Sequence, residues 1–236
     1  MSLRDIVVKI TVALKLYKPI VRVLNYFQEK HKSNKVKKYG VKTIAEAEKA
    51  FSDIGMTMFP AFGTLLGAVR DHGFIPYDYD LDVGVAGDFD LDAIHNAMEQ
   101  HGFILNKQIY IPELNNIVSE ETYYREGVGI DVIYFFQEGD DYFAFIPGHH
   151  EYKDWKEANT SDGFPMTKCL VPVSGFERKD FLGISLNFPI KVHQWLCDLY
   201  GENYMTPIKD WNNKRDKLKT RRTTAKERCY RRLISE

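Results

Sequence analysis

The sequence predicts an α/β (α+β) protein in which a small mixed sheet is flanked by helices. Short apolar runs, such as 81–85 and 127–136, alternate with segments such as 90–101, in which apolar residues recur at helical spacing. Alternation of these two periods along one chain is typical of helices packed against a sheet. With 236 residues, 44% of them hydrophobic, the chain is long enough for one such domain with appendages.

The first elements expected along the chain are helical. One helix is expected over 3–28, followed by a polar hinge at 25–38 and a second helix over 43–55. Thr43 as N-cap and Gly55 just past the end mark the boundaries of the second helix. Beyond them, strands are expected over 56–62, 81–85, 103–111, 127–136 and 142–146, and helices over 65–71, 90–101 and 189–200. Residues 147–180 are expected to be rich in loops, and the polar tail from 209 to be partly helical.

Charge divides the chain into three regions, although the net charge is only −1. Residues 1–42 carry 11 Lys and Arg against 2 acids, and we interpret them as a basic amphipathic helix with a hinge. Residues 209–236 carry 11 against 4 and form a basic tail. The main domain, 43–208, is acidic, with 10 basic and 27 acidic residues.

The basic ends indicate an anionic partner. Lysines interleaved with Val, Leu and Ile in the first helix favour peripheral attachment to an anionic membrane surface, at the cytoplasmic face. The alternative is that this helix packs on the domain or in an oligomer interface, and the oligomeric state is not determined by the sequence. Nucleic acid is not an expected partner, because the chain has no RNA-binding module that we recognise.

Three cysteines, Cys169, Cys197 and Cys229, form neither a CxxC pair nor an even set for disulfides. This usage predicts a reducing, cytoplasmic compartment and no structural zinc. Lysines at 9, 15 and 18 interrupt the first apolar run, so neither a signal peptide nor a membrane-spanning helix is expected there.

The most informative stretch contains carboxylates at alternating positions. Asp80 and Asp82 share one face of an expected strand, about 7 Å apart. Two carboxylates so close repel each other unless a cation or a proton lies between them. Mg²⁺, with Mn²⁺ as the alternative, is the cation expected, and Mg²⁺ commonly completes its shell with phosphate oxygens. The pattern therefore predicts phosphoryl or nucleotidyl chemistry.

Two further acids extend this pattern. Asp131 stands inside an apolar strand, where a carboxylate needs a partner; the partner is either the same metal or an arginine or backbone group. Asp78 completes the alternation and is interpreted as a ligand of a second metal, as a general base, or as a solvated neighbour.

Two blocks of this sequence resemble the LicD/fukutin family of the nucleotidyltransferase superfamily. The first is Gly63-Thr-Leu-Leu-Gly-Ala-Val-Arg70 together with Gly73-Phe-Ile-Pro-Tyr-Asp78-Tyr-Asp80-Leu-Asp82, and the second lies within 181–207. The resemblance covers about 43–208 and implies a nucleotidyltransferase-like catalytic domain. It further implies transfer of phosphocholine or an alditol phosphate from a CDP-activated donor to a glycan or polyol-phosphate acceptor, with release of CMP, in cell-surface polysaccharide synthesis.

The resemblance also suggests roles for individual residues. Asp80, Asp82 and Asp131 would hold the metal on the donor diphosphate. The backbone amides of Gly63 and Thr64, at a helix start, are expected to bind a phosphate oxygen. Arg70 is expected to bind a phosphate as well, with an ion pair to a neighbouring acid as its alternative.

Tyr77 and Tyr79 stand where bacterial members often have Trp and Asp, which favours ribitol or glycerol phosphate over phosphocholine. Two rival functions remain: a true nucleotidyltransferase that moves NMP from an NTP, and a non-catalytic protein that binds a phosphopolymer.

Overall fold

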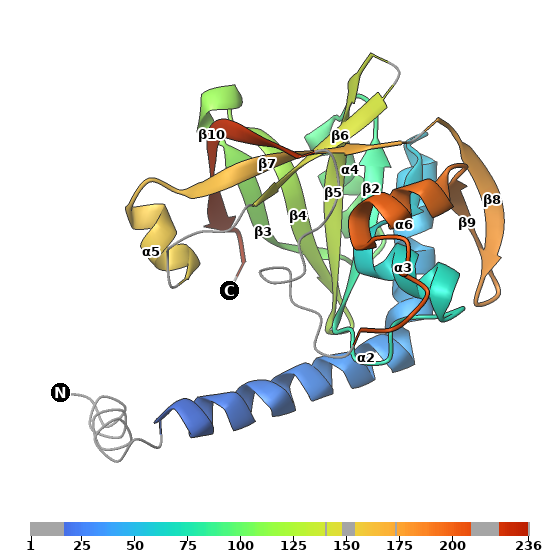
Figure 1. The fold of residues 1–236 in the computed structure, drawn as a ribbon, viewed down its shortest axis with the longest axis horizontal. Coiled ribbons are helices and arrows are strands. Elements are labelled where there is room, and N and C mark those ends of the chain that lie inside the picture. The colour runs from blue at the N-terminus through green and yellow to red at the C-terminus, as the bar shows by residue number, and fades with distance from the viewer. Residues whose placement is uncertain (1–16, 140, 148–153, 173, 209–221, 236) are drawn as a thin grey trace.

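The computed structural model describes residues 17–139, 141–147, 154–172, 174–208 and 222–235 (Figure 1). It confirms the predicted fold class, but the main sheet has eight strands where five were expected. A two-stranded sheet accompanies it. The strands of the main sheet are β1 (Met58–Pro60), β2 (Asp80–Ala86), β3 (Ile104–Ile111), β4 (Ile117–Arg125), β5 (Val128–Glu138), β6 (Asp141–Pro147), β7 (Phe164–Val171) and β10 (Arg222–Leu233).

The strand order is β1-β2-β5-β4-β3-β10-β7-β6, and it closes on itself because β6 also pairs with β5. The closure is possible because β5 is long: residues 129–135 pair with β2, and residues 135–138 pair with β6. Strands β2 and β5 run parallel, whereas the other described pairs in this sheet are antiparallel. The parallel pair is where the predicted acids lie.

Helix α2 (Tyr17–Asp53) is continuous, so the expected hinge at 25–38 is wrong, and Thr43 lies inside the helix rather than at its start. At Gly40 a Cβ would lie 2.8 Å from Cε2 of Phe74, so a glycine is needed for the helix to pack this closely. The helix ends as predicted before Gly55, whose φ is +70°. One buried stripe with a spacing of three or four residues explains the continuity: Ser33, Val36, Gly40, Ile44, Ala47 and Phe51.

The first half of α2 extends beyond the domain (Figure 1). Its apolar side chains Ile20, Val23, Leu24 and Phe27 are exposed. Residues 1–16, which include the start of the expected helix, lie outside the described part of the chain. Among the described helices, none is both long and apolar enough to span a bilayer. Contact of this segment with an anionic membrane stays a prediction.

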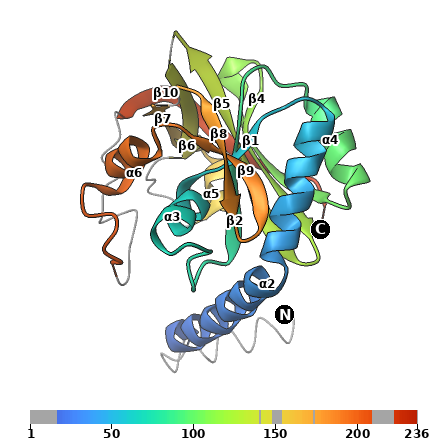
Figure 2. The ribbon, with the colours of Figure 1, turned by 90° about the vertical axis from the view of Figure 1, so that its right-hand side faces the viewer.

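The other helices lie on opposite faces of the main sheet. Figure 2 shows α3 (Phe62–Arg70) and α6 (Val192–Tyr200) on one side, and α4 (Leu91–Gln100) beside the second half of α2 on the other. The α4 helix begins at Asp90, whose side chain accepts a hydrogen bond from the amide of Ala93. The two faces of the sheet are therefore covered by different helices, and their side chains lie in different surroundings.

Two segments differ from what the sequence predicts. The expected loops over 147–180 contain, within the described residues, α5 (Trp155–Thr160), strand β7 and strand β8 (Phe176–Phe181) of a hairpin with β9 (Ile184–Pro189). Residues 222–233 of the expected basic tail form β10, which inserts between β3 and β7; residues 209–221 lie outside the described part. The secondary structure of both segments depends on pairing with strands far away in the sequence, and neither segment shows a clear period of its own.

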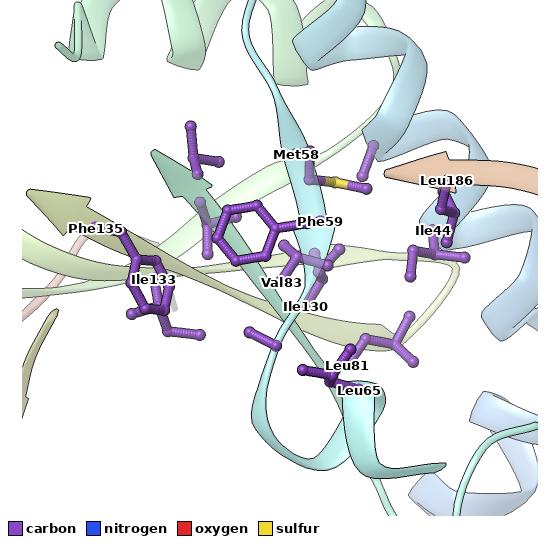
Figure 3. Close-up of a cluster of buried hydrophobic side chains, with 14 of the residues drawn as sticks. Ile44, Met58, Phe59, Leu65, Leu81, Val83, Ile130, Ile133, Phe135 and Leu186 are labelled. Atoms are coloured by element: carbon purple, nitrogen blue, oxygen red, sulfur yellow. The ribbon is translucent and has the colours of Figure 1, made fainter. Parts of the chain in front are cut away.

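The main core lies between the sheet and its helices. Phe59 of β1 contacts Phe135 of β5 and Trp195 of α6, with ring centroids 5.3 and 6.0 Å apart. This aromatic cluster joins three elements that are distant in the sequence, and it anchors the edge of the sheet beside the acids. Figure 3 shows one part of this core, with Ile44, Met58, Phe59, Leu65, Leu81, Val83, Ile130, Ile133, Phe135 and Leu186 labelled.

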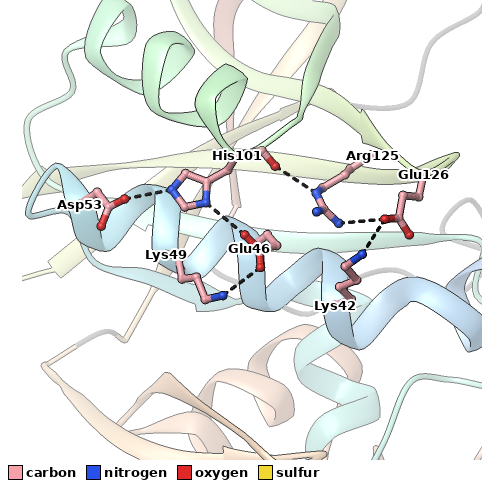
Figure 4. A network of polar contacts seen from close by, with 7 residues as sticks. All are labelled: Lys42, Glu46, Lys49, Asp53, His101, Arg125 and Glu126. Atoms are coloured by element: carbon pink, nitrogen blue, oxygen red, sulfur yellow. Dashed lines mark hydrogen bonds and ion pairs between the residues drawn. The ribbon is translucent and has the colours of Figure 1, made fainter.

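A polar network ties α2 to α4 and β4 (Figure 4). His101, just after α4, contacts Asp53 through Nε2 at 2.9 Å and Glu46 through Nδ1 at 3.2 Å. The two acids, Asp53 first, raise the pKa of this histidine. The carbonyl of His101 accepts a hydrogen bond from Nε of Arg125 at 3.0 Å. The remaining members are Lys42, Lys49 and Glu126.

This network predicts a pH-dependent contribution to stability. Because the pKa of His101 is raised in the folded protein, its contribution is complete below about pH 6.5 and is lost as pH rises through the folded pKa. His101→Gln should therefore lower the free energy of unfolding by about 1 kcal/mol at pH 5.5, and by much less at pH 9. Urea unfolding at both pH values measures this; an equal loss at the two would contradict the prediction.

Candidate active site

Three aspartates predicted to act together lie on two neighbouring parallel strands. Asp82 of β2 is directly opposite Asp131 of β5. Asp80 precedes Asp82 by two residues, so its side chain lies on the same face of the sheet. Leu81 and Val83 point to the other face and are fully buried. The predicted alternation in β2 is confirmed, and the parallel pairing brings Asp131 beside it.

The turn into α3 positions one of these carboxylates. The amide of Gly63 donates to Oδ2 of Asp82 at 2.9 Å, and the amide of Asp82 donates to Oγ1 of Thr64 at 2.8 Å. A Cβ at position 63 would lie 3.0 Å from Oδ2 of both Asp78 and Asp82. The carboxylates of Asp78 and Asp82 therefore both lie close to Gly63, in space that a side chain at this position would occupy. The amide of Gly63 is engaged by Asp82, and binding of a phosphate by this turn stays a prediction.

Arg70, at the end of α3, forms a two-point ion pair with the next residue. Its Nε and Nη2 donate to Oδ1 and Oδ2 of Asp71, at 2.9 and 2.7 Å. This is the alternative considered from the sequence, and its role as a phosphate ligand stays a prediction. Asp78 lies close to this pair: burial raises the pKa of Asp78 to about 6, Arg70 opposes the rise and Asp71 adds to it. Asp78 therefore joins the site, while its role stays open.

The acids of the site are partly buried and repel one another. Burial and the neighbouring Asp131 and Asp78 raise the pKa of Asp80 to about 7. Burial, followed by Asp80 and Asp131, raises the pKa of Asp82 well above its ordinary value. A cation bound between these carboxylates would favour their ionised form.

Glu121, on the opposite face of the sheet, shows the contrast. This side chain is fully buried, more completely than the site acids, yet its pKa is lowered, because hydrogen bonds outweigh the effect of burial. Its carboxylate bonds with His95 at 2.7 Å and with Gln108, Tyr123 and Tyr134 at 2.6 Å each. Glu121 has the partners that a structural carboxylate needs. Asp78, Asp80 and Asp82 carry raised pKa values instead, which is typical of a functional site.

Three residues of the site were not found from the sequence. Thr122 of β4 is the register partner of both Asp131 and Lys107, and its hydroxyl donates to Oδ1 of Asp131. Lys107 Nζ lies 3.9 Å from Oδ1 of Asp131 and 3.5 Å from Oε1 of Glu120. Burial and Asp131 raise the pKa of Glu120 to about 7. The sequence did contain a signal for two of them: Glu120 and Thr122 are two positions apart, so they would share one face of a strand. No strand was expected in this segment.

A cavity of about 230 Å³ opens beside these acids. Its floor is the start of β2 and β5, and Lys32 of α2 forms part of its wall. The cavity therefore combines two acids, Asp80 and Asp131, with two lysines, Lys32 and Lys107. Acids can bind a cation and lysines can bind an anionic substrate, so the lining suits both together. The lining residues are Lys32, Tyr79, Asp80, Lys107, Thr122, Tyr124, Gly127, Gly129 and Asp131.

The donor set of the site fits a hard divalent cation, since carboxylate oxygens are the ligands that Mg²⁺ prefers. Across the described ranges, no three His, Cys, Asp or Glu side chains are placed to hold a metal ion, and metal binding by Asp80, Asp82 and Asp131 stays a prediction. One oxygen of Asp82 accepts from Gly63, and one oxygen of Asp131 accepts from Thr122. Asp80 has no such bond among those described, so its carboxylate has the most capacity for a ligand.

Fold and site together define a nucleotidyltransferase-type domain. Residues 55–191 match the LicD/FKTN/FKRP nucleotidyltransferase domain, and the chain belongs to this family, as the two sequence blocks predicted. It is similar to the protein named ribitol-5-phosphate transferase FKTN from Mus musculus, at 27% identity over 70% of the chain, and from Homo sapiens, at 26% over 72%. The matches cover 33% and 34% of those two proteins, so the chain spans about a third of their length.

Proposed function

We propose that this protein transfers an alditol phosphate, such as ribitol or glycerol phosphate, from a CDP-activated donor to a hydroxyl of a glycan or polyol-phosphate acceptor. CMP leaves, and the product belongs to a cell-surface polysaccharide. The observation that carries the proposal is the side-by-side placement of Asp82 and Asp131, with Asp80 on the same face. The name of the FKTN relatives supports an alditol phosphate as the transferred group, and phosphocholine is the alternative.

In this proposal Asp80, Asp82 and Asp131 would hold Mg²⁺, or Mn²⁺, beside the diphosphate of the donor. The cation, when bound, neutralises the charge that develops on the departing CMP. Gly63 and Thr64 keep Asp82 in place through the two hydrogen bonds described above. Positioning and charge neutralisation are the main requirements of phosphoryl transfer. In this proposal the residues supply the positioning, and the cation that they hold would supply the neutralisation.

Lys107 and Asp78 would act next to the cation. Lys107, 3.9 Å from Asp131, brings a positive charge toward the phosphates of the donor. Asp78 would take the proton of the acceptor hydroxyl, or bind a second cation. Burial raises the pKa of Asp78 to about 6, which suits a general base that works near neutral pH.

The decisive experiment measures which product forms. Purified protein is incubated with CDP-ribitol, CDP-glycerol or CDP-choline and a glycan or polyol-phosphate acceptor, with Mg²⁺ or with EDTA. We expect CMP only with Mg²⁺, and fastest with one of the two CDP-alditols. Mg²⁺-dependent protection against thermal unfolding by the same nucleotides identifies the donor independently of the acceptor.

Two outcomes would replace the proposal. Pyrophosphate released from an NTP, with no CMP from any CDP donor, would assign the protein as a true nucleotidyltransferase. Tight binding of a phosphopolymer without any turnover, unchanged by Asp80→Asn, would assign it as a non-catalytic binding protein.

A further inference from the structure

A second cavity continues the first along helix α2. It measures about 210 Å³ and is lined by Asn25, Gln28, Glu29, Lys32 and Tyr79. Lys32 and Tyr79 line both cavities. The two cavities are therefore neighbours that share this pair of side chains. We refer to them together as the groove, which runs from Asp80 and Asp131 along the exposed half of α2.

Helix α2 brings a regular polar face to this groove. Residues 25, 28, 29 and 32 are three or four positions apart, so their side chains follow one side of the helix. The exposed apolar residues Ile20, Val23, Leu24 and Phe27 lie on a different side, because their positions follow a separate helical row. All of these residues precede 55–191, the part that matches the family domain. This wall of the groove is thus built outside that domain.

The chemistry of the groove suits a ligand rich in hydroxyl groups that also carries a negative charge. The amides of Asn25 and Gln28 both donate and accept hydrogen bonds, and Glu29 accepts them. Tyr79 is 42% exposed, and Lys32 Nζ lies 5.6 Å from the centroid of its ring, so an aromatic ring lies next to a cation. Among the described residues that line the second cavity, Tyr79 is the one aromatic ring, so successive bases of RNA would have no rings on which to stack. The same described lining includes no aliphatic side chain for a lipid tail.

We propose that this groove binds the acceptor: a phosphate-bearing polyol or glycan chain lies along α2 and presents its terminal hydroxyl to the acids. Asn25, Gln28 and Glu29 bind hydroxyl groups, Tyr79 packs against the carbon skeleton, and Lys32 pairs with a phosphate of the acceptor. The inference rests on the proposed function and deepens it, because it assigns acceptor recognition to a helix outside the matched domain.

The test uses the full chain with both Asn25 and Gln28 changed to Ala. Asn34 and Lys37 changed together to Ala form the matched control, because both are exposed on α2 and neither lines the groove. We expect the groove variant to raise KM for the acceptor by about 10-fold, as the loss of two hydrogen bonds implies, with the KM for the CDP donor unaffected. The control variant should match the wild type. An unchanged acceptor KM, or an equal rise in donor KM, would overturn the proposal.

Direct binding separates this proposal from the proposed function. Oligomeric ribitol phosphate is titrated into the wild type and both variants by calorimetry, without a donor, and uncharged maltotriose serves as the comparison probe. Binding by the wild type and the control, weakened about 10-fold in the groove variant, supports the groove even if no CDP donor is turned over. Equal binding by all three proteins, or no binding by any of them, rejects the groove, whatever the activity assay shows.

Discussion

Replacing Asp80 or Asp82 by Asn is expected to abolish transfer and, at the same time, to stabilise the metal-free protein. Either change removes one carboxylate from the group around Asp131: Asp82 is its register partner, and Asp80 lines the same cavity as Asp131. Because these two carboxylates are proposed metal ligands, the loss of either should lower the rate by about three orders of magnitude or more. In Asp82→Asn the side-chain oxygen still accepts the hydrogen bond from Gly63, so the fold of the α3 turn should be retained.

The gain in stability follows from the raised pKa values. The pKa of Asp80 is about 7 in the folded protein, against about 3.9 in an unfolded chain. Between those values the folded state binds more protons than the unfolded state, so the free energy of unfolding falls as pH rises from 4 to 7 and stays low above pH 7. At pH 8 in EDTA, Asn at position 80 should raise the free energy of unfolding by roughly 1 to 3 kcal/mol.

Activity assays and denaturant unfolding in EDTA measure the two effects, with Asp88→Asn as the control. Asp88 is an exposed acid near the end of the same strand, so its replacement should change neither quantity. Mg²⁺ should raise the stability of the wild type and the control, and it should raise the stability of the two site variants much less. A fully active Asp82→Asn protein would remove this carboxylate from the metal site. A loss of stability in EDTA would show that the carboxylates are not in mutual repulsion.

Gly63→Ala is the second change with a large expected effect, on activity rather than on folding. A Cβ at this position would lie 3.0 Å from Oδ2 of Asp78 and of Asp82, and the carboxylates would have to move by a few tenths of an ångström. Because displaced catalytic groups cost up to about 100-fold in rate, we expect a loss of that order. Stability should change little, since Ala is favoured over Gly inside a helix by about 1 kcal/mol.

Gly73→Ala is the matched control for this change. Gly73 precedes the same acids, and the nearest atoms to its added Cβ would lie at 3.9 Å, an ordinary contact distance. Circular dichroism and thermal unfolding should show both variants folded, while CMP release falls only in Gly63→Ala. Equal activity in the two variants would mean that the contact between Gly63 and the two carboxylates has no role in the reaction.

Local patterns explain which features were predictable from the sequence. Strand β2 and the shared face of Asp80 and Asp82 follow from a period of two residues, which no distant contact needs to establish. Helix α4 follows from its spacing and from Asp90 as its N-cap. The polar stretch at 25–38 was misread, because its buried positions, Ser33 and Val36, are few and include a serine.

The sequence by itself therefore determined the fold class, the family and the paired carboxylates, because periodicity and a contiguous motif are local properties of the chain. Only the tertiary structure decided which side chains join them. Thr122 and Lys107 reach Asp131 through the pairing of β3, β4 and β5, and Lys32 reaches the cavity because α2 continues without a hinge. The pairing of β10 between β3 and β7 was decided in the same way. Strand partners are chosen by contacts between segments far apart in the chain, and those contacts leave no period in the sequence.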